Sequence, residues 1–532
     1  MLKPYLFFYL IKAREKNDIN IIINIILIKM GIPYYFYMLT KKYNNILKTN
    51  IDFKPDIYCI DFNGIIHPIA NIYNDDNKIY EELWKKINNY TNIYNPKKMY
   101  ICVDGVAPLA KIIQQRKRRY LSNYTKLINK EIIKWDTNAI TPGTNFMNNL
   151  NNYFNNKIRN NTNNTTYYYS GSDINGEGEH KIFYHLKKYN NNINIIINGL
   201  DADLIILSLI SHKKNIYLER EKNINDNTDY NYVNINQLRI AIINELIIKF
   251  ELDNNDYNDY YSDISNSLIE TYCTMCSLLG NDFIPHLLTL NLKNNGLDEL
   301  IIFTKNSIKK YGFLIENNQI NYKCLNEIFY QLCQKEDDNL CKLNETYINK
   351  NIYNSTINSE FYALKNKDII SKQIYSDFKK WKYIYYNNKF YTNIYLDSSL
   401  IFKACSNYIK GIYWTYYYYK FNIIDHNWYY PYNFPPIIKD IYNHCQGNEE
   451  PIIENIGNYL ENDIQLLIVL PKSSNNLLNN KLKKYTEDIN LGLYHMFPSK
   501  FHIHTYLKTH LWECYPELPK INIDLIKNIL YS

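Results

Sequence analysis

Seven carboxylates stand out in this sequence, because each lies in a short motif beside an apolar run or at a helix-like start. Three apolar runs end in acid, and these are "DIYCIDFNG", "KMYICVDGV" and "INIIINGLDADLIIL". Two further motifs, "NGEGEH" and "LLGNDF", place acids beside glycine. The set comprises Asp61, Asp104, Glu177, Glu179, Asp201, Asp203 and Asp282.

These carboxylates predict a site for divalent cations if the fold brings them together. Converging carboxylates cannot all stay ionised without cations, and oxygen-only ligands suit Mg²⁺ or Mn²⁺. Two such ions about 4 Å apart would activate a water and stabilise the leaving oxygen of an in-line phosphodiester displacement. A single aspartate at a strand end is more often a helix cap or a loop acid. The prediction therefore depends on all five motifs together.

A basic segment, "APLAKIIQQRKRRY", follows Asp104 after a short loop. In a helix, Lys111, Gln115, Arg118 and Arg119 fall at i, i+4, i+7 and i+8, which puts them on one face. Cations with an amide donor between them suit a terminal phosphate. A solvated basic face is the alternative, but the nearby acid favours a phosphate site.

His67 lies six residues after Asp61, close to the expected rim of the same site. An imidazole there could stack on a nucleic-acid base. Taken alone, a histidine in this position is more often structural, and both interpretations stay open from the residues.

The elements that must position these residues follow from the hydrophobic pattern. Continuous apolar runs alternate with helical patterns, which predicts an α/β fold with a mainly parallel sheet between helices. In such sheets ligands bind beyond the carboxyl ends of the strands, where the acids lie. The Asn-rich stretch 151–168 predicts a loop, and 334–365 predicts a polar connector. A more aromatic, helical region then occupies 366–532.

Composition sets broad limits on the kind of protein. Lys and Arg total 60 against 53 Asp and Glu, and the net charge of +7 permits a polyanionic partner without requiring one. Ten scattered cysteines argue for a reducing compartment. We expect a cytoplasmic protein, and a nuclear location stays open. The lone CxxC, Cys273 and Cys276, predicts buried thiols rather than half of a zinc site. No apolar run reaches the roughly 18 residues that span a bilayer, so we expect no membrane partner.

The motifs resemble those of the XRN-type 5′→3′ exoribonucleases. The matching stretches follow the family's order from Met30 to the end, and "DGVAPLAKIIQQRKRR" is the most specific. The others include "MGIPYYFYML", "DFNGIIHPIA", "GEGEHKI", "GLDADLIILSL", "GNDFIPHLLTL", "YIKGIYWTYYYY" and "WYYPYNFPP".

The resemblance implies a PIN/flap-nuclease-like catalytic region over 30–333 and a helical second region over 366–532. It implies processive, Mg²⁺-dependent hydrolysis of single-stranded RNA with a 5′-monophosphate to nucleoside 5′-monophosphates, as in RNA decay. The seven acids match the family's metal ligands. The residues that match its 5′-phosphate pocket are Lys111, Gln115, Arg118 and Arg119.

The resemblance also implies that a base stacks between His67 and a tryptophan of the second region, for which Trp428 and Trp414 are candidates. The sequence departs from the family at "DHNWYYP", where His426 replaces a tryptophan. It also departs at Leu109 and Asn175, where the family has Arg and Pro.

Residues 1–29 precede Met30, which matches the family's first residue, and we expect them to be an upstream-start artefact. We expect a monomer.

Two other functions have to be weighed. A flap-type DNA endonuclease shares the acidic cluster, but it usually carries a Gly-rich helix-hairpin-helix where this chain has "GNDFIPHLLTLNL". A catalytically inactive RNA-binding scaffold would not need the acids, and all seven are present. Both alternatives are less consistent with the motifs than an RNA exonuclease.

Overall fold

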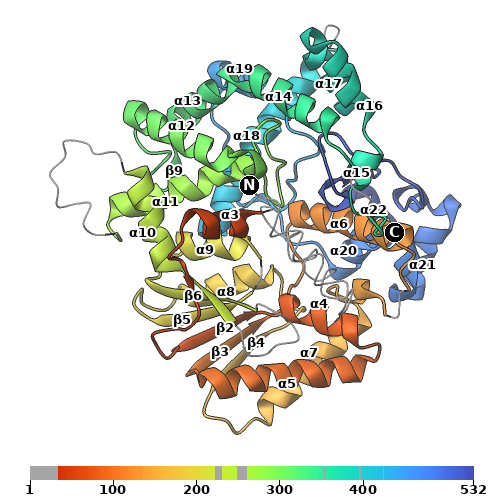
Figure 1. The fold of residues 1–532 in the computed structure, drawn as a ribbon. Coiled ribbons are helices and arrows are strands. Elements are labelled where there is room, and N and C mark those ends of the chain that lie inside the picture. The colour runs from red at the N-terminus through yellow and green to blue at the C-terminus, as the bar shows by residue number, and fades with distance from the viewer. Residues whose placement is uncertain are drawn as a thin grey trace.

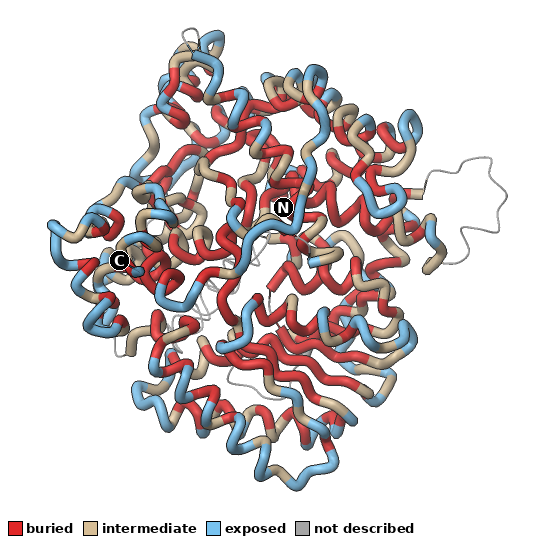
Figure 2. The backbone as a smooth tube through the Cα atoms, turned by 180° about the vertical axis from the view of Figure 1, so that it is seen from behind, coloured by how far each residue is buried: buried red, intermediate tan, exposed pale blue. Residues whose placement is uncertain are grey.

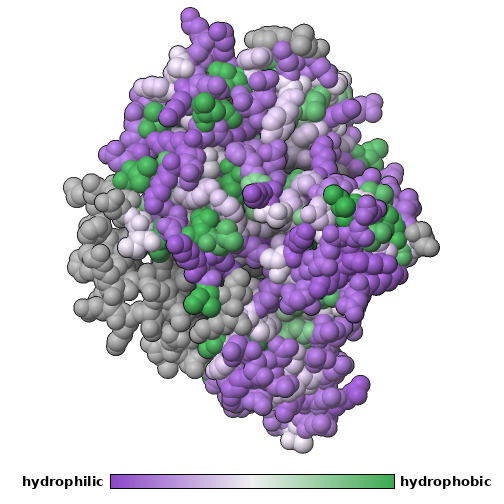
Figure 3. Space-filling model, turned by 90° about the vertical axis from the view of Figure 1, so that its right-hand side faces the viewer, coloured by the Kyte–Doolittle hydropathy of each residue, from purple (hydrophilic) through white to green (hydrophobic). Residues whose placement is uncertain are grey.

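The computed structural model describes residues 34–531, except 133–134, 200, 222–229, 248–259, 353–354, 395–396 and 423. The segment 1–29, which we expect to be an artefact of the start site, lies outside the described residues. In the described part of the chain, no helix combines the length and apolar character needed to cross a bilayer. On the face drawn in Figure 3, hydrophilic side chains predominate and hydrophobic ones gather in small separate groups.

A mainly parallel sheet forms the centre of the N-terminal half (Figure 1). The order of its seven described strands is β1-β7-β6-β5-β2-β3-β4. Neighbours from β6 to β4 pair in parallel, whereas β7 is antiparallel to both β6 and β1. This arrangement confirms the predicted α/β fold. The strands are β1 Leu47–Lys48, β2 Ile57–Asp61, β3 Lys98–Cys102, β4 Thr166–Ser170, β5 Asn194–Asn198, β6 Asn215–Glu221 and β7 Tyr230–Asn234.

Helices cover both faces of the sheet and bury alternate strand residues. In β2, Tyr58 and Ile60 join the core beneath α4, α5 and α7, whereas Ile57 and Cys59 join the core shared with α8, α9 and α10. The central strands β2, β3 and β5 are almost entirely buried, and Figure 2 shows buried backbone through the middle of the sheet. The helices of this half are α3 Tyr35–Lys42, α4 Asn63–Ile72, α5 Asp76–Tyr94, α6 Leu109–Ile128, α7 Asn145–Arg159, α8 Gly178–Leu186, α9 Asp203–Ile210, α10 Ile235–Leu246 and α11 Asp263–Cys276.

The C-terminal half is largely helical and shares one continuous core with the sheet. Trp414 and Tyr418 of α18 are fully buried in the same core as Cys59 and Leu204. Two small two-stranded sheets interrupt the helices. One pairs β8 Ile315–Glu316 with β9 Gln319–Ile320, and the other pairs β10 Ile503–His504 with β11 Tyr515–Pro516. The helices are α12 Gly296–Tyr311, α13 Tyr322–Gln334, α14 Glu336–Asn349, α15 Tyr362–Lys365, α16 Ile369–Ser376, α17 Trp381–Lys389, α18 Ser399–Phe421, α19 Ile438–Gly447, α20 Asn462–Val469, α21 Asn480–Glu487 and α22 Ile523–Tyr531.

The prediction of a loop over 151–168 is wrong. Helix α7 continues to Arg159, and β4 begins at Thr166 and pairs with β3. The side chain of Thr144 caps α7 by accepting a hydrogen bond from the backbone N–H of Met147. Phe154 and the helix's other apolar residues face the core, so the asparagines occupy the outer face. The Asn-rich composition hid this amphipathic pattern.

The stretch 334–365 contains helical structure as well as polar residues. Helix α14 covers much of it, and its Leu340 and Tyr347 are buried. The hydroxyl of Tyr347 lies 3.1 Å from the carbonyl oxygens of both Ala363 and Thr505 and shares its one proton between them. This segment therefore packs as part of the folded body. The lone CxxC also behaves as predicted, since Cys273 and Cys276 are both free and buried.

Candidate active site

Three neighbouring strands bring four of the acids to one edge of the sheet. Asp61 is the last residue of β2, and Asp104 follows β3, which pairs with β2 in parallel. Asp201 and Asp203 follow β5, the parallel neighbour of β2 on its other side. Because the carboxyl ends of parallel strands meet at one edge, the predicted convergence follows directly from the strand order.

Two hydrogen bonds fix the carboxylate of Asp104. The side-chain amide of Asn63 donates to its Oδ2 at 2.9 Å, and the backbone N–H of Gly178 donates to its Oδ1 at 2.7 Å. In return, the backbone N–H of Asp104 donates to Oδ1 of Asn63 at 3.1 Å. The start of α4, the loop after β3 and the start of α8 are thereby joined at Asp104.

The "GEGE" motif opens α8 and adds two buried carboxylates to the cluster. Glu177 precedes the helix, Glu179 lies in its first turn, and both are buried. Between them, a Cβ on Gly178 would lie 3.0 Å from Oδ1 of Asp61 and 3.4 Å from Oδ1 of Asp104. Glycine at this position therefore allows the backbone to approach the two carboxylates closely.

Lys111 of α6 is inserted between carboxylates from two other elements. Its Nζ lies 2.5 Å from Oε2 of Glu177 and 2.7 Å from Oδ2 of Asp282, and its side chain is only 7% exposed. Gln114 donates to the other oxygen of Asp282 at 3.2 Å. Asp282 itself lies in the turn that follows α11 and Gly280. The seventh predicted acid therefore joins the cluster through α6.

Burial raises the pKa of five of the carboxyl groups, and neighbouring carboxylates raise it further. The pKa of Asp203 rises well above its usual range because of burial, Asp201 and Asp282. The ammonium group of Lys111 opposes these shifts, and its own pKa is raised because the carboxylates outweigh its burial. The five acids are Asp61, Glu177, Glu179, Asp201 and Asp203.

The donor set fits divalent cations. Both carboxylate oxygens of Asp203 are buried and have no hydrogen-bond partner in the described part of the chain. Such oxygens are costly to bury unless a cation or a proton satisfies them. Ligand atoms of Glu177, Glu179 and His180 also lie within 4.8 Å of one another. His180 is a group that the sequence analysis did not single out.

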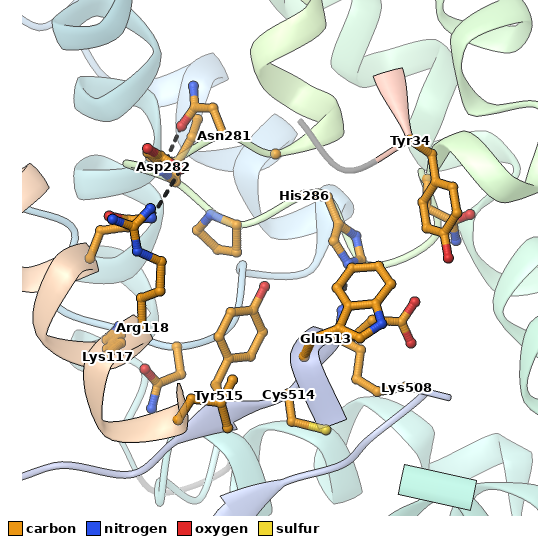
Figure 4. A pocket seen from close by; sticks show the side chains of 18 of the residues that line it. Tyr34, Lys117, Arg118, Asn281, Asp282, His286, Lys508, Glu513, Cys514 and Tyr515 are labelled. Atoms are coloured by element: carbon orange, nitrogen blue, oxygen red, sulfur yellow. Dashed lines mark hydrogen bonds between the residues drawn. The ribbon is translucent and has the colours of Figure 1, made fainter. Parts of the chain in front are cut away.

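The cluster opens into a cavity of about 900 Å³ between the two halves of the chain. Asp61, Asp201 and Asp282 line it together with His67 and Arg118. Figure 4 shows Lys117 and Arg118 of α6 on the same side of the cavity as Asp282. Acidic and basic residues from distant parts of the sequence therefore line one shared cavity.

The four residues predicted for a terminal phosphate lie on α6 but differ in their surroundings. Lys111 is engaged with carboxylates, and Gln115 is 6% exposed with no partner for its Oε1 among the described residues. Arg119 lines the cavity and donates to the carbonyl oxygens of Asn138 and Ile140 at 3.3 and 3.2 Å. Arg118 also lines the cavity. Burial and Asp282 raise the pKa of the Asp201 carboxyl, and the charge of Arg118 opposes this shift.

His67 lies on α4 and contributes to the cavity lining. Burial, followed by the charges of Arg118, Arg119 and Lys126, lowers its pKa to about 3. The imidazole is therefore neutral at physiological pH, which suits stacking more than ion pairing.

The structure does not bring the candidate tryptophans to the cavity. Trp428 is 6% exposed, packs against Trp414 at 5.2 Å between ring centroids, and does not line the cavity. Trp414 is fully buried and donates through Nε1 to the carbonyl of Asp425. The ring of His426 packs against Tyr459. The predicted stacking role of Trp428 is therefore not supported by its position, because the hydrophobic core surrounds its ring.

Besides Gln114 and His180, two further residues that contact the cluster were missed by sequence reasoning. Asn63, next to the end of β2, could have been noticed as an amide beside a strand-end acid. Tyr418 of α18 donates to Oε1 of Glu177 at 2.8 Å, and its ring stacks on His180 at 3.8 Å. A tyrosine within the run "YYYY" gives no local signal for this contact.

Three curated relatives are similar to the chain over most of its length. The 5′-3′ exoribonuclease 1 of Homo sapiens is 27% identical, with 93% of this chain and 33% of the relative covered. The 5′-3′ exoribonuclease 1 of Saccharomyces cerevisiae is 25% identical, with 91% and 42% covered. The 5′-3′ exoribonuclease 2 of Gallus gallus is 23% identical, with 93% and 69% covered. The chain thus spans less than half the length of the first two.

Two family models match the sequence. The model described as the N-terminus of the XRN 5′-3′ exonucleases matches residues 30–222. The model described as the Xrn1 helical domain matches residues 263–380 and 363–528. These matches cover the sheet apart from β7, the acidic cluster and most of the helical half, so the chain belongs to the XRN family of 5′-3′ exonucleases.

Proposed function

We propose that this protein is a 5′→3′ exoribonuclease that removes nucleoside 5′-monophosphates from single-stranded RNA bearing a 5′-monophosphate, as part of RNA decay. The observation that carries the proposal is the shared cavity, which three acids of the cluster line together with two arginines of α6; these residues are Asp61, Asp201, Asp282, Arg118 and Arg119. The names of the relatives, which are 5′-3′ exoribonucleases, agree with this chemistry.

The acidic cluster would hold two Mg²⁺ ions, or Mn²⁺, through oxygen ligands. The proposed ligands are Asp61, Asp104, Glu177, Glu179, Asp201, Asp203 and Asp282. When bound, such ions supply activation of water and stabilisation of charge on the leaving oxygen. The raised pKa of Asp203 and its unpartnered oxygens support a role for this residue as a ligand.

The residues of α6 would set the position of the RNA relative to the cleaved bond. Arg118 lies on the cavity wall beside Asp282, where its guanidinium can bind a terminal phosphate in a fork geometry (Figure 4). Arg119, Lys111 and Gln115 complete the proposed pocket. A terminal phosphate held at a fixed distance from the carboxylates places the first phosphodiester at the cluster, which explains removal of single nucleotides.

His67 would stack on a base at the rim, because its ring is neutral and lines the cavity. The aromatic partner on the opposite side is more consistent with a cavity-lining tyrosine, such as Tyr429 or Tyr432, than with the buried Trp428.

The decisive experiment compares 5′-monophosphorylated RNA, triphosphorylated or capped RNA, and a matched DNA flap, each with and without EDTA. We expect only the monophosphorylated RNA to be degraded, from its 5′ end, and only with Mg²⁺. Cleavage within the DNA flap would favour a flap endonuclease, and RNA binding without any cleavage would favour an inactive scaffold.

A second comparison tests the phosphate pocket alone. Arg118→Ala is expected to remove most of the preference for monophosphorylated over triphosphorylated RNA, because the terminal phosphate loses its guanidinium. Arg159→Ala, which removes an exposed arginine of α7 outside the cavity, is the matched control. An unchanged preference in Arg118→Ala would refute the pocket.

A further inference from the structure

Part of the cavity lies away from the carboxylate cluster, and we call this part the far lobe. Tyr34, His286, Lys508, Trp512 and Tyr515 line it. In Figure 4, Asp282 and Arg118 lie on one side of the cavity, and Tyr34, His286 and Lys508 lie on the other. Nothing in the catalytic proposal uses the far lobe, although it is continuous with the site.

Lys508 is a cation without a carboxylate partner among the described residues. Its Nζ lies 2.9 Å from Nε2 of His286, and its charge lies 5.4 Å from the ring centroid of Tyr515. His286 directs Nδ1 at the carbonyl oxygen of Leu287 at 2.8 Å, so Nδ1 carries the proton and Nε2 accepts from Lys508. Burial and Lys508 lower the pKa of His286 to about 3, so the pair carries one positive charge.

The nearby carboxylate of Glu513 is already occupied. It pairs with Lys293 and accepts the backbone N–H groups of Thr509 and His510 at 2.8 and 3.0 Å. Burial alone would raise the pKa of Glu513, but Lys293 lowers it to about 2. Glu513 and Lys293 therefore neutralise each other, and the charge of Lys508 remains uncompensated. The ammonium group of Lys508 has two further N–H donors and lines the cavity, so it can bind an anion there.

The backbone before Lys508 is held in an uncommon conformation. Leu507 has a φ of 56°, in the left-handed region that a bulky residue rarely adopts. The backbone N–H of Lys508 donates to the carbonyl of Thr505 at 3.0 Å, which closes the turn. Strained turns of this kind persist where the surrounding structure fixes them, often to direct a side chain at a ligand.

An aromatic surface lines the same cavity as Lys508. The ring of Trp512 lies 5.7 Å from Tyr34 and stacks on His510 at 5.9 Å with an interplanar angle of 10°. Trp512 is half-buried and lines the cavity, so part of its ring is available. Lys508 and Trp512 line the same cavity, and Nζ of Lys293 lies 5.7 Å from the centroid of the Trp512 ring. A cation and an aromatic ring in one cavity can bind one phosphate and one base of a single strand.

The far lobe lies close to the proposed cleavage site along the chain. His286 follows Asp282 by four residues, and both line the cavity, so an extended chain between them spans at most about 14 Å. The basic face of α6 lies beside Asp282 as well. A strand whose 5′ end is at α6 and whose first phosphodiester is at the cluster would therefore continue into the far lobe.

We propose that the far lobe binds the RNA strand on the 3′ side of the cleaved bond, with Lys508 contacting a backbone phosphate and Trp512 stacking on a base. This inference deepens the proposed function and rests on it. The far lobe would bind RNA of any sequence, because every nucleotide has a phosphate and a base that can stack on an aromatic ring. It would hold the remaining strand after each nucleotide leaves.

The first test compares Lys508→Met with the unsubstituted protein on monophosphorylated RNA of two lengths. A dinucleotide has no phosphate beyond the cleaved one, whereas a long strand reaches the far lobe. We expect KM for the long strand to rise about tenfold, which corresponds to about 1.4 kcal/mol for one lost phosphate contact, and KM for the dinucleotide to change far less. Equal changes at both lengths would overturn the proposal.

The second test measures binding without cleavage, by fluorescence anisotropy of a labelled long RNA in EDTA. Between roughly 50 and 200 mM salt, losing one phosphate contact should reduce the slope of log K against log salt by about 0.7. Lys508→Arg should restore the slope, which separates lost charge from misfolding. Lys520→Met, at an exposed lysine outside the cavity, should leave it unchanged.

The two tests separate the inference from the proposed function. If the unsubstituted protein cleaves none of the RNAs, the proposed function fails, while the salt slope still tests the far lobe. If it cleaves RNA and Lys508→Met keeps the original slope, the far lobe proposal fails and the function stands.

Discussion

The hydroxyl of Tyr418 donates a 2.8 Å hydrogen bond to Oε1 of Glu177, and this contact joins two residues 241 positions apart. Tyr418 belongs to α18 in the helical half, whereas Glu177 precedes α8 beside the sheet. Both residues are buried, and Oε2 of the same carboxylate contacts Lys111. The helical half therefore fixes the orientation of a proposed metal ligand, which makes Tyr418 a positioning residue.

Tyr418→Phe is expected to weaken Mg²⁺ binding by about tenfold, because partners that orient a metal ligand typically contribute that much. Isothermal titration calorimetry of Mg²⁺ binding measures the effect independently of catalysis. Tyr416→Phe is the matched control on the same helix, since that hydroxyl donates to Glu270 at 2.8 Å instead. Both variants should lose roughly 1–3 kcal/mol of stability. Equal Mg²⁺ affinities would disprove the positioning role.

Gly178→Ala is expected to reduce both activity and Mg²⁺ affinity. The new Cβ would lie 3.0 Å from Oδ1 of Asp61 and 3.0 Å from the carbonyl oxygen of Cys102, so either α8 or the carboxylates must move. A misplacement of about 1 Å can cost around a hundredfold in rate. Gly447→Ala in α19 is the control, because its Cβ meets no atom within 4 Å. We expect that variant to keep full activity and to gain up to about 1 kcal/mol in stability. Steady-state kinetics and thermal melting measure both.

Asp203→Asn is expected to stabilise the metal-free protein and to abolish RNA cleavage. The Asp203 carboxylate is 1% exposed, has no hydrogen-bond partner among the described residues, and lies near Asp201 and Asp282. Neutralising it removes a repulsion of the order of 1–3 kcal/mol, so the melting temperature in EDTA should rise. Added Mg²⁺ should then stabilise this variant less than the unsubstituted protein. A lower melting temperature in EDTA would contradict the electrostatic argument.

The sequence predicts the acidic half of the site well for a physical reason. Buried parallel strands are continuous apolar runs, so Asp61 and Asp104 stand out where each run ends. Parallel pairing then brings the strand ends together without further information. The helix after Asp104 was equally predictable, because its cations recur at helical spacing.

Other features depend on packing between segments that are far apart and carry no local signal. Tyr418 lies in a tyrosine run where any of four rings could face Glu177, and only the packing of α18 decides which one does. The position of Trp428 also depends on such packing, because its ring packs against Trp414 and Gly411 in the core. In α7, asparagine replaces the usual charged residues on the outer face and hides the helix.

A buried carboxylate outside the site predicts how stability depends on pH. Glu336 of α14 is 1% exposed, and its two oxygens accept the backbone N–H groups of Ile438 and Lys439 at 2.7 and 3.1 Å. These residues begin α19, so Glu336 joins two helices. Burial outweighs the two hydrogen bonds and raises the pKa of Glu336 from 4.5 to about 7.

Glu336→Gln is therefore expected to remove part of the pH dependence of folding. A carboxyl group with a raised folded pKa stabilises the protein below its unfolded pKa of 4.5, and this contribution disappears as the pH rises through about 7. From pH 5 to pH 8, the unsubstituted protein should lose on the order of 2–3 kcal/mol relative to the variant. Urea unfolding at both pH values measures the free energy of unfolding of each protein. Both proteins contain the acidic cluster, so its contribution cancels when they are compared. Glu345→Gln, an exposed change on the same helix, should keep the original pH dependence, and a similar response of both variants would refute the assignment to Glu336.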